Sequence, residues 1–191
     1  FGMPTMLRIP DVVGVKLVGQ FAPGVLATDL ALVVTHDLRK LGVTGEFVEF
    51  YGPGVSTLTA GDRSVVANMA PEYGATTGYF PVDSNTLEYL KSTGREEAAL
   101  GLVEGYAKRQ GLWFDDAAEP RYTKRITIDL SAIEMHIAGP KRPQDLLPYA
   151  KSGAALAALN FQPVTHSATL PKHPVAIAAI TSCTNTSDPA L

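Results

Sequence analysis

The chain has 191 residues, 46% of them hydrophobic, which is enough to bury the core of one compact domain and part of a second. Its 16 basic and 19 acidic residues give a formal net charge of -3, so no strong basic field marks nucleic acid as the main partner. Neither a long apolar run nor a signal-peptide layout is present, and we expect a cytoplasmic protein without membrane contact. A single cysteine, Cys183, excludes an internal disulfide and a self-contained cysteine metal site.

The first part of the sequence alternates strand and helix patterns. Residues 12–18 alternate apolar with smaller or polar residues, which predicts a strand. Apolar residues then recur at helical spacing, which predicts a helix that Thr28 and Asp29 cap and that Gly42 ends in the left-handed conformation. Residues 43–50 are dense in apolar and aromatic side chains, as in a strand of a sheet covered on both faces.

The middle of the sequence predicts further helices. Thr59 and Asp62 have the spacing of a capping box, so we expect a helix through Met69, and Pro71 limits its extension. Glycines then close two more predicted helices, and a strand pattern follows them. These elements cover residues 84–92, 96–110 and 125–130.

The last part of the sequence predicts a boundary between two units. Residues 139–148 (GPKRPQDLLP) contain three prolines, which is typical of a turn or a crossing. Residues 175–180 (VAIAAI) are fully apolar and predict a short buried strand. The alternation of strands and helices along the chain indicates an α/β sandwich with parallel strand pairing.

Cys183 is the first candidate for chemistry. It follows the apolar run within TSCTNTS (181–187), a segment rich in hydroxyl groups. Hydroxyls and backbone N–H groups at a strand end favour an anion, so a thiolate forms more readily there than in a core. The position suits metal binding or nucleophilic chemistry, whereas spacing alone favours a buried structural cysteine.

Asn68 and Glu72 are the second candidate. They are four residues apart, so a continuous helix would place an amide and a carboxylate on one face, where both could contact one ligand. Solvated helical residues of these types are the commoner case.

Glu46 and Glu49 are unusual because they lie in the strand predicted over residues 43–50. A carboxylate in a covered strand needs a partner, which Arg63 or Lys40 could supply. We therefore interpret these two glutamates as structural rather than catalytic.

Four segments together resemble aconitases of the cytosolic iron-regulatory-protein type and their bacterial relatives. They occur in the family's order along nearly the whole chain: GEFVEFYGPGV (45–55), AGDRSVVANMAPEYGATTGYFPVD (60–83), AGPKRPQD (138–145) and AAITSCTNTSDP (178–189). The resemblance implies a three-layer α/β/α sandwich with a mostly parallel sheet. It also implies that residues 1–145 are the second domain of such an enzyme, and that residues 146–191 are a linker and the truncated start of the third, cluster-bearing domain.

The resemblance assigns roles to the candidate residues. It implies that Cys183 is the first of three thiolates that hold a [4Fe-4S] cluster, the other two coming from a downstream C-x-x-C that this sequence lacks. Three thiolates leave one iron open as a Lewis acid. Asn68 and Glu72 match an asparagine and a glutamate of the family that lie in the cluster region. The resemblance implies that the amide of Asn68 lies near the cluster and that the carboxylate of Glu72 forms a hydrogen bond with the water or hydroxyl on the open iron. Asn185 lies near a surface that iron-regulatory relatives use for RNA when the cluster is lost.

The implied activity is that of a longer parent protein, a tricarboxylic acid cycle hydro-lyase that interconverts citrate and isocitrate through cis-aconitate. The alternatives are a 2-methylcitrate or 2-methylisocitrate hydro-lyase, an RNA-binding role of the cluster-free parent, and a stand-alone structural or binding module. The remaining aconitase domains would act in cis on a small tricarboxylic acid.

Four expectations concern the isolated chain. We expect it to be inactive and to bind no iron. We expect residues 181–191 to be exposed, mobile or held by neighbouring molecules in a crystal. We also expect a helix over residues 60–70 that presents Asn68 at its end, with Glu72 in or just after its last turn and both side chains facing an open surface.

Overall fold

The computed structural model describes residues 2–4, 6, 8–139, 141–142, 144–163, 165 and 168–179. Its main feature is a four-stranded sheet in the order β3-β2-β1-β4, in which every neighbouring pair is parallel. The strands are β1 (Val12–Val18), β2 (Phe47–Tyr51), β3 (Thr77–Tyr79) and β4 (Lys124–Asp129). The α/β class and the parallel pairing expected from the sequence are therefore confirmed.

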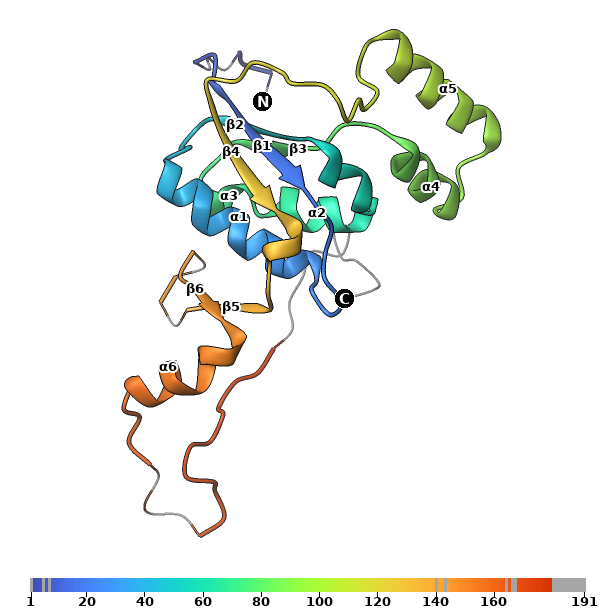
Figure 1. The fold of residues 1–191 in the computed structure, drawn as a ribbon. Coiled ribbons are helices and arrows are strands. Elements are labelled where there is room, and N and C mark those ends of the chain that lie inside the picture. Colours follow the sequence, from blue (N-terminus) through green and yellow to red (C-terminus); the bar gives the residue numbers. More distant parts are fainter. Residues whose placement is uncertain are drawn as a thin grey trace.

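Six α-helices accompany the sheet within the described residues. They are α1 (Ala27–Leu41), α2 (Ala60–Asn68), α3 (Ala70–Tyr73), α4 (Ser84–Ser92), α5 (Glu97–Arg109) and α6 (Ser152–Ala158). Figure 1 shows α1, α2 and α3 together under the sheet, α4 and α5 as a pair to one side, and α6 well below the sheet. In the ranges that the structure describes, none of these helices combines the length and the apolar character that crossing a membrane requires.

Alternation along the central strands decides which face of the sheet becomes the core. Successive side chains of a strand point to opposite faces, so Val13, Val15 and Leu17 of β1 share one face, where all three are fully buried. The register places Val48 and Phe50 of β2 beside them, also buried. Residues of α1, α2 and α3 complete the same apolar cluster, so the core lies between the sheet and these helices.

The start of β2 differs from the expectation in position and in burial. The strand begins at Phe47 because Gly45 turns the chain at a φ of 79° and the N–H of Glu46 bonds the carbonyl of Val43 at 3.0 Å. The side chain of Phe47 is 37% exposed. Tyr51, on the same face, is 6% exposed and its ring lies 5.1 Å from that of Tyr122. In the described part of the chain the helices α1–α3 form a layer on one face of this strand, and its other face is covered only in part.

The caps of α1 were only partly predicted. Gly42 ends the helix at a φ of 76°, as expected. The N-terminal cap is Leu26 rather than Thr28 or Asp29, because the carboxylate of Asp29 reaches back from the first turn and accepts the N–H of Leu26 at 2.8 Å. The acidic side chain thus satisfies a backbone donor from inside the helix.

The capping box predicted for α2 is confirmed. Thr59 Oγ1 accepts the N–H of Asp62 at 3.1 Å, and the carboxylate of Asp62 accepts the N–H of Thr59 at 2.8 Å. The helices and the strand predicted over residues 84–130 are also present, with bounds that differ by about one residue, as boundaries usually do.

The proline-rich segment over residues 139–148 ends in a strand of a hairpin. The strands β5 (His136–Ala138) and β6 (Leu146–Pro148) pair antiparallel, so β6 forms the last part of this segment and the turn lies before it. The predicted turn is confirmed, but the pairing of its flanks was missed because three-residue strands carry too little pattern. The domain boundary after residue 145 stays a prediction.

The strand predicted over residues 175–180 is wrong for its described part. Residues 175–179 form no regular element, and Val175 and Ile177 are 79% and 87% exposed. An apolar run becomes a strand only where another strand takes up its backbone N–H and C=O groups. Residue 180 lies outside the described residues.

Gly54 offers a test of how β1 packs against the short 3-10 helix Pro53–Thr57. A Cβ at this position would lie 2.8 Å from the backbone carbon of Leu17 and 2.9 Å from the nitrogen of Val18. We expect Gly54→Ala to lower the free energy of unfolding by about 1–3 kcal/mol, because backbone atoms must move apart. Urea unfolding measures the effect. The control Gly105→Ala, where nothing lies within 4 Å, should leave the chain equally or more stable, and equal losses would contradict the packing argument.

Candidate functional site

Asn68 and Glu72 lie on two consecutive helices rather than on one. Helix α2 ends at Asn68, and Met69 leaves the helical conformation with a φ of -85° and a ψ of 14°. Helix α3 begins at Ala70 with Pro71 in its first turn, where a missing backbone N–H costs nothing. The prediction that a helix presents Asn68 at its end is confirmed, whereas the continuous helical face is wrong because the chain breaks at Met69.

The two side chains differ in exposure. Asn68 is exposed, as predicted, whereas Glu72 is half-buried. Within the part of the chain that the structure describes, the Oε2 atom of Glu72 is buried and has no hydrogen-bond partner. An unpaired buried carboxylate oxygen is costly, so it is typical of an atom that meets a ligand or a partner from elsewhere. The catalytic roles of both residues stay predictions.

Tyr73 lies next to Glu72 and is almost fully buried. Its hydroxyl also has no hydrogen-bond partner among the described residues. Burial, and then the charge of the Glu72 carboxylate, raise the pKa of Tyr73 well above its usual value, so the phenol stays neutral. Gly78 makes room for this ring, because a Cβ there would overlap the Tyr73 hydroxyl.

Arg39 is a residue of this region that sequence reasoning missed. It lies in the last turn of α1, where its Nε donates to the carbonyl of Glu72 at 2.5 Å and its Nη2 to the carbonyl of Pro71 at 3.3 Å. The separation of 33 residues between Arg39 and Glu72 carries no local pattern. Only the packing of α1 against α3 brings them together.

Arg63 does not pair with Glu46 or Glu49 as suggested from the sequence. Its guanidinium is buried and binds both carboxylate oxygens of Asp83, with Nη1 to Oδ1 at 2.8 Å and Nη2 to Oδ2 at 2.5 Å. Burial, and then the neighbouring carboxylate of Glu49, raise the pKa of Tyr122 above its usual value. The fold thus brings Glu49 close to a phenol on the open face of the sheet.

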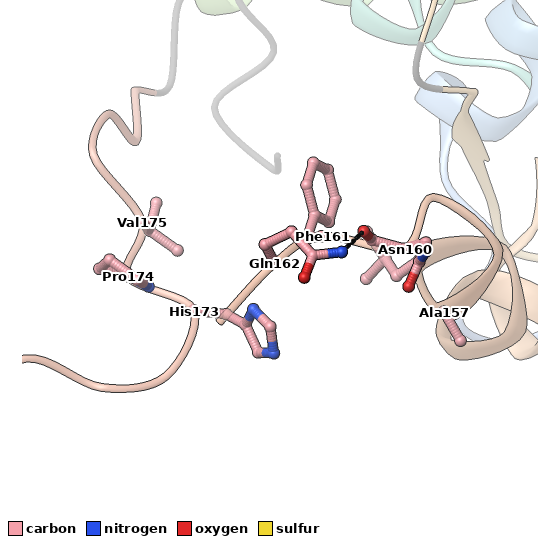
Figure 2. Close-up of a pocket in the computed structure, with 8 residues that line it drawn as sticks. Ala157, Asn160, Phe161, Gln162, His173, Pro174 and Val175 are labelled. Carbon is pink, nitrogen blue, oxygen red and sulfur yellow. Dashed lines mark hydrogen bonds between the residues drawn. The ribbon is translucent and has the colours of Figure 1, made fainter. Parts of the chain in front are cut away.

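Two hollows lie away from Asn68 and Glu72. A cleft of about 930 Å³ on the open face of the sheet is lined by Glu49 and aromatic side chains, among them Tyr79 and Tyr122. A groove of about 680 Å³ runs between the end of α6 and residues 173–175 (Figure 2). Its lining is largely apolar, and the hydrogen bond from Gln162 to the carbonyl of Asn160 measures 3.4 Å. Of the residues that the sequence singled out, Glu49 lines the cleft, and none is among the described residues that line the groove.

Cys183 and Asn185 lie outside the described residues, together with the rest of the segment 181–191. In the ranges that the structure describes, no group of three His, Cys, Asp or Glu residues could hold a metal ion. A [4Fe-4S] cluster takes several thiolates acting together, and Cys183 is the single cysteine of this sequence. The residues of this chain therefore do not make a complete cluster site by themselves.

Comparison with known proteins decides the family. The model of the aconitase family (aconitate hydratase) matches residues 1–191, the whole of the sequence. The chain belongs to the aconitase family. The resemblance found in four of its segments is thereby confirmed.

Relatives within the aconitase family are similar over the full chain. Aconitate hydratase A of Escherichia coli (strain K12) is 48% identical over 205 residues, which cover 100% of the chain and 23% of that protein. The same figures hold for phosphinomethylmalate isomerase of Streptomyces viridochromogenes. Aconitate hydratase A of Staphylococcus aureus (strain MW2) is 47% identical over 212 residues, covering 98% of the chain and 23% of the relative. The chain spans about 23% of the length of these relatives.

Proposed function

We propose that the chain is one part of a longer iron–sulfur hydro-lyase that interconverts citrate and isocitrate through cis-aconitate in the cytoplasm. The proposal rests on one observation in a chain of the aconitase family: the Oε2 atom of Glu72 is buried and has no hydrogen-bond partner among the described residues. Two of the relatives described above bear the name aconitate hydratase A. In this proposal residues 1–145 form the second domain, residues 146–191 begin the third, and the other domains act in cis.

The proposed chemistry of Glu72 is proton transfer. Dehydration of citrate breaks a C–O bond and a C–H bond on the neighbouring carbon and forms a C=C bond. In this proposal a base of another part of the longer protein takes the carbon-bound proton, and the departing hydroxyl must gain a proton to leave as water. A carboxyl group that bonds this oxygen gives the proton in one direction and takes it back in the other. The buried position of Oε2 strengthens such a bond, because water does not compete for it. The exposed amide of Asn68 donates an N–H to a substrate oxygen nearby.

The cluster belongs to the longer protein in this proposal. Cys183 contributes one thiolate, and the remaining ligands come from segments that this sequence does not contain. When bound, the cluster supplies a Lewis acid that polarises a substrate oxygen. We therefore assign to this chain the proton transfer at Glu72, the orientation by Asn68 and a single ligand position.

The choice of citrate as the substrate is a separate part of the proposal. The relative named phosphinomethylmalate isomerase is as similar to this chain as aconitate hydratase A, so identity alone does not choose between them. A 2-methylcitrate or 2-methylisocitrate hydro-lyase is the second candidate. RNA binding by the cluster-free protein rests on the resemblance around Asn185 and stays a prediction.

Iron content and turnover of the longer protein test the proposal together. We expect the wild type to hold stoichiometric iron and to convert citrate faster than 2-methylcitrate. Cys183→Ser should lose both iron and turnover, because a serine hydroxyl does not replace a thiolate in a cluster. The neighbouring Ser182→Ala is the control and should keep the iron. Preference for the methylated substrate would overturn the substrate choice, and a Cys183→Ser protein with full iron would overturn the ligand assignment.

A further inference from the structure

Helix α3 is too short to hold Glu72 in place by itself. It has four residues, Ala70–Tyr73, and an isolated helical turn is unstable in water because one hydrogen bond does not offset the ordering of several residues. The N–H of Gly74 bonds the carbonyls of Ala70 at 2.9 Å and of Pro71 at 3.1 Å. The carbonyl of Glu72 lacks such a bond from the helix's own backbone, as is usual for the last turn of a helix.

Arg39 supplies the missing donor from another helix. Its Nε and Nη2 atoms bind the carbonyls of Glu72 and Pro71, two consecutive residues of α3. The planar guanidinium presents these donors in a fixed fork, which a lysine ammonium cannot do.

The guanidinium binds the backbone of Glu72 and not its carboxylate. An arginine beside a glutamate ordinarily forms an ion pair, yet no such pair joins Arg39 and Glu72 among the described residues, and Oε2 has no partner there. The contact therefore fixes where the residue lies while it leaves the carboxylate free. A purely stabilising ion pair would do the opposite.

We propose that Arg39 is a positioning residue for Glu72. By tying α3 to the end of α1, it holds the carboxylate at the place where the substrate hydroxyl leaves or returns. The inference rests on the proposed function for its kinetic consequence, but the tie between the two helices is independent of any activity.

The first arm of the test measures hydrogen exchange in the longer protein. The amides of Tyr73 and Gly74 bond carbonyls at the start of α3, so their exchange reports whether the turn stays closed. We expect Arg39→Gln to speed their exchange by about tenfold, the effect of losing a charged hydrogen bond. In Arg39→Gln the exchange rates of the α1 amides should be unchanged. In Lys40→Gln, which alters the exposed residue next to Arg39, the exchange rates of Tyr73 and Gly74 should also be unchanged. Equal exchange in wild type and Arg39→Gln would overturn the inference whether or not the protein is a hydro-lyase.

The second arm separates positioning from general stability. We expect Arg39→Gln to lower kcat by about 10- to 100-fold with KM nearly unchanged, since small displacements of a reacting group cost this much. Arg39→Lys should fall between wild type and Arg39→Gln, because one ammonium binds one carbonyl well and not two. A loss of kcat that only follows a lowered Tm, or one matched by Lys40→Gln, would contradict positioning. If the wild type shows no hydro-lyase turnover, the proposed function fails and the exchange arm alone decides the role of Arg39.

Discussion

Glu72→Gln is expected to lower the kcat of the longer hydro-lyase by about 10²- to 10⁴-fold, the usual contribution of a positioned acid or base. Glutamine keeps the size of the side chain and its ability to form hydrogen bonds but neither gives nor takes a proton. The KM for citrate should change little, because the lost interaction belongs to the transition state. Steady-state rates with citrate and isocitrate measure the effect in both directions.

The same substitution should not weaken the fold. The carboxylate of Glu72 has a buried oxygen without a partner in the described part of the chain, so exchange for a neutral amide removes a cost rather than a contact. We expect the unfolding free energy of Glu72→Gln to equal or exceed that of wild type. Glu88→Gln on α4, where the side chain is exposed, is the matched control and should leave kcat and stability unchanged. A destabilised Glu72→Gln protein with full turnover would show that Glu72 has a structural role.

Asp83→Asn is expected to cost about 3–5 kcal/mol of unfolding free energy, the largest stability effect we anticipate. The change removes the charge that faces Arg63, whose side chain is 5% exposed and also donates to the carbonyl of Val55 at 3.0 Å. Asparagine retains a side-chain oxygen that can cap the N-terminus of α4. The lost unfolding free energy therefore measures the effect of leaving the buried Arg63 guanidinium without an opposite charge, and not the effect of removing the cap. Urea unfolding of wild type and variant gives the difference.

An exposed ion pair provides the control for Asp83→Asn. Lys108 and Glu104 form an i, i+4 pair on α5, and both side chains are largely open to solvent. Glu104→Gln breaks this pair and leaves Lys108 Nζ over the Trp113 ring, 4.8 Å from its centroid. It should change the unfolding free energy by less than about 0.5 kcal/mol, because water screens such pairs. Equal losses of unfolding free energy in the two variants would show that burial does not determine how much the Arg63–Asp83 pair stabilises the fold.

Several elements of the fold could be predicted because their signals are local. The strand over residues 12–18, the capping box of Thr59 and Asp62, and the end of α1 at Gly42 each depend on residues within one or two turns of each other. Periodicity and caps act at this distance, and the structure confirms all three. The family could be predicted for a different reason, since four long segments match it in order.

The errors share a physical cause. The strand predicted over residues 175–180 and the cover expected on both sides of residues 43–50 each required a neighbour that the local sequence does not specify. Apolar composition shows that a segment can be buried, but burial depends on what packs against it. The break at Met69 follows from Pro71, which the sequence displays, yet its geometry depends on how α3 packs.

The sequence by itself determined the α/β alternation, the capping box of α2, the end of α1 at Gly42, the family and the choice of Asn68, Glu72 and Cys183 as candidates. Only the tertiary structure decided that Arg63 pairs with Asp83, which is 20 residues away in the sequence. It also decided that Arg39 donates to the carbonyl of Glu72, which is 33 residues away in the sequence. Such contacts leave no periodic trace, because they form only after strands and helices have packed. The buried Oε2 of Glu72 belongs with them, since its burial and its lack of a partner among the described residues are properties of the folded chain.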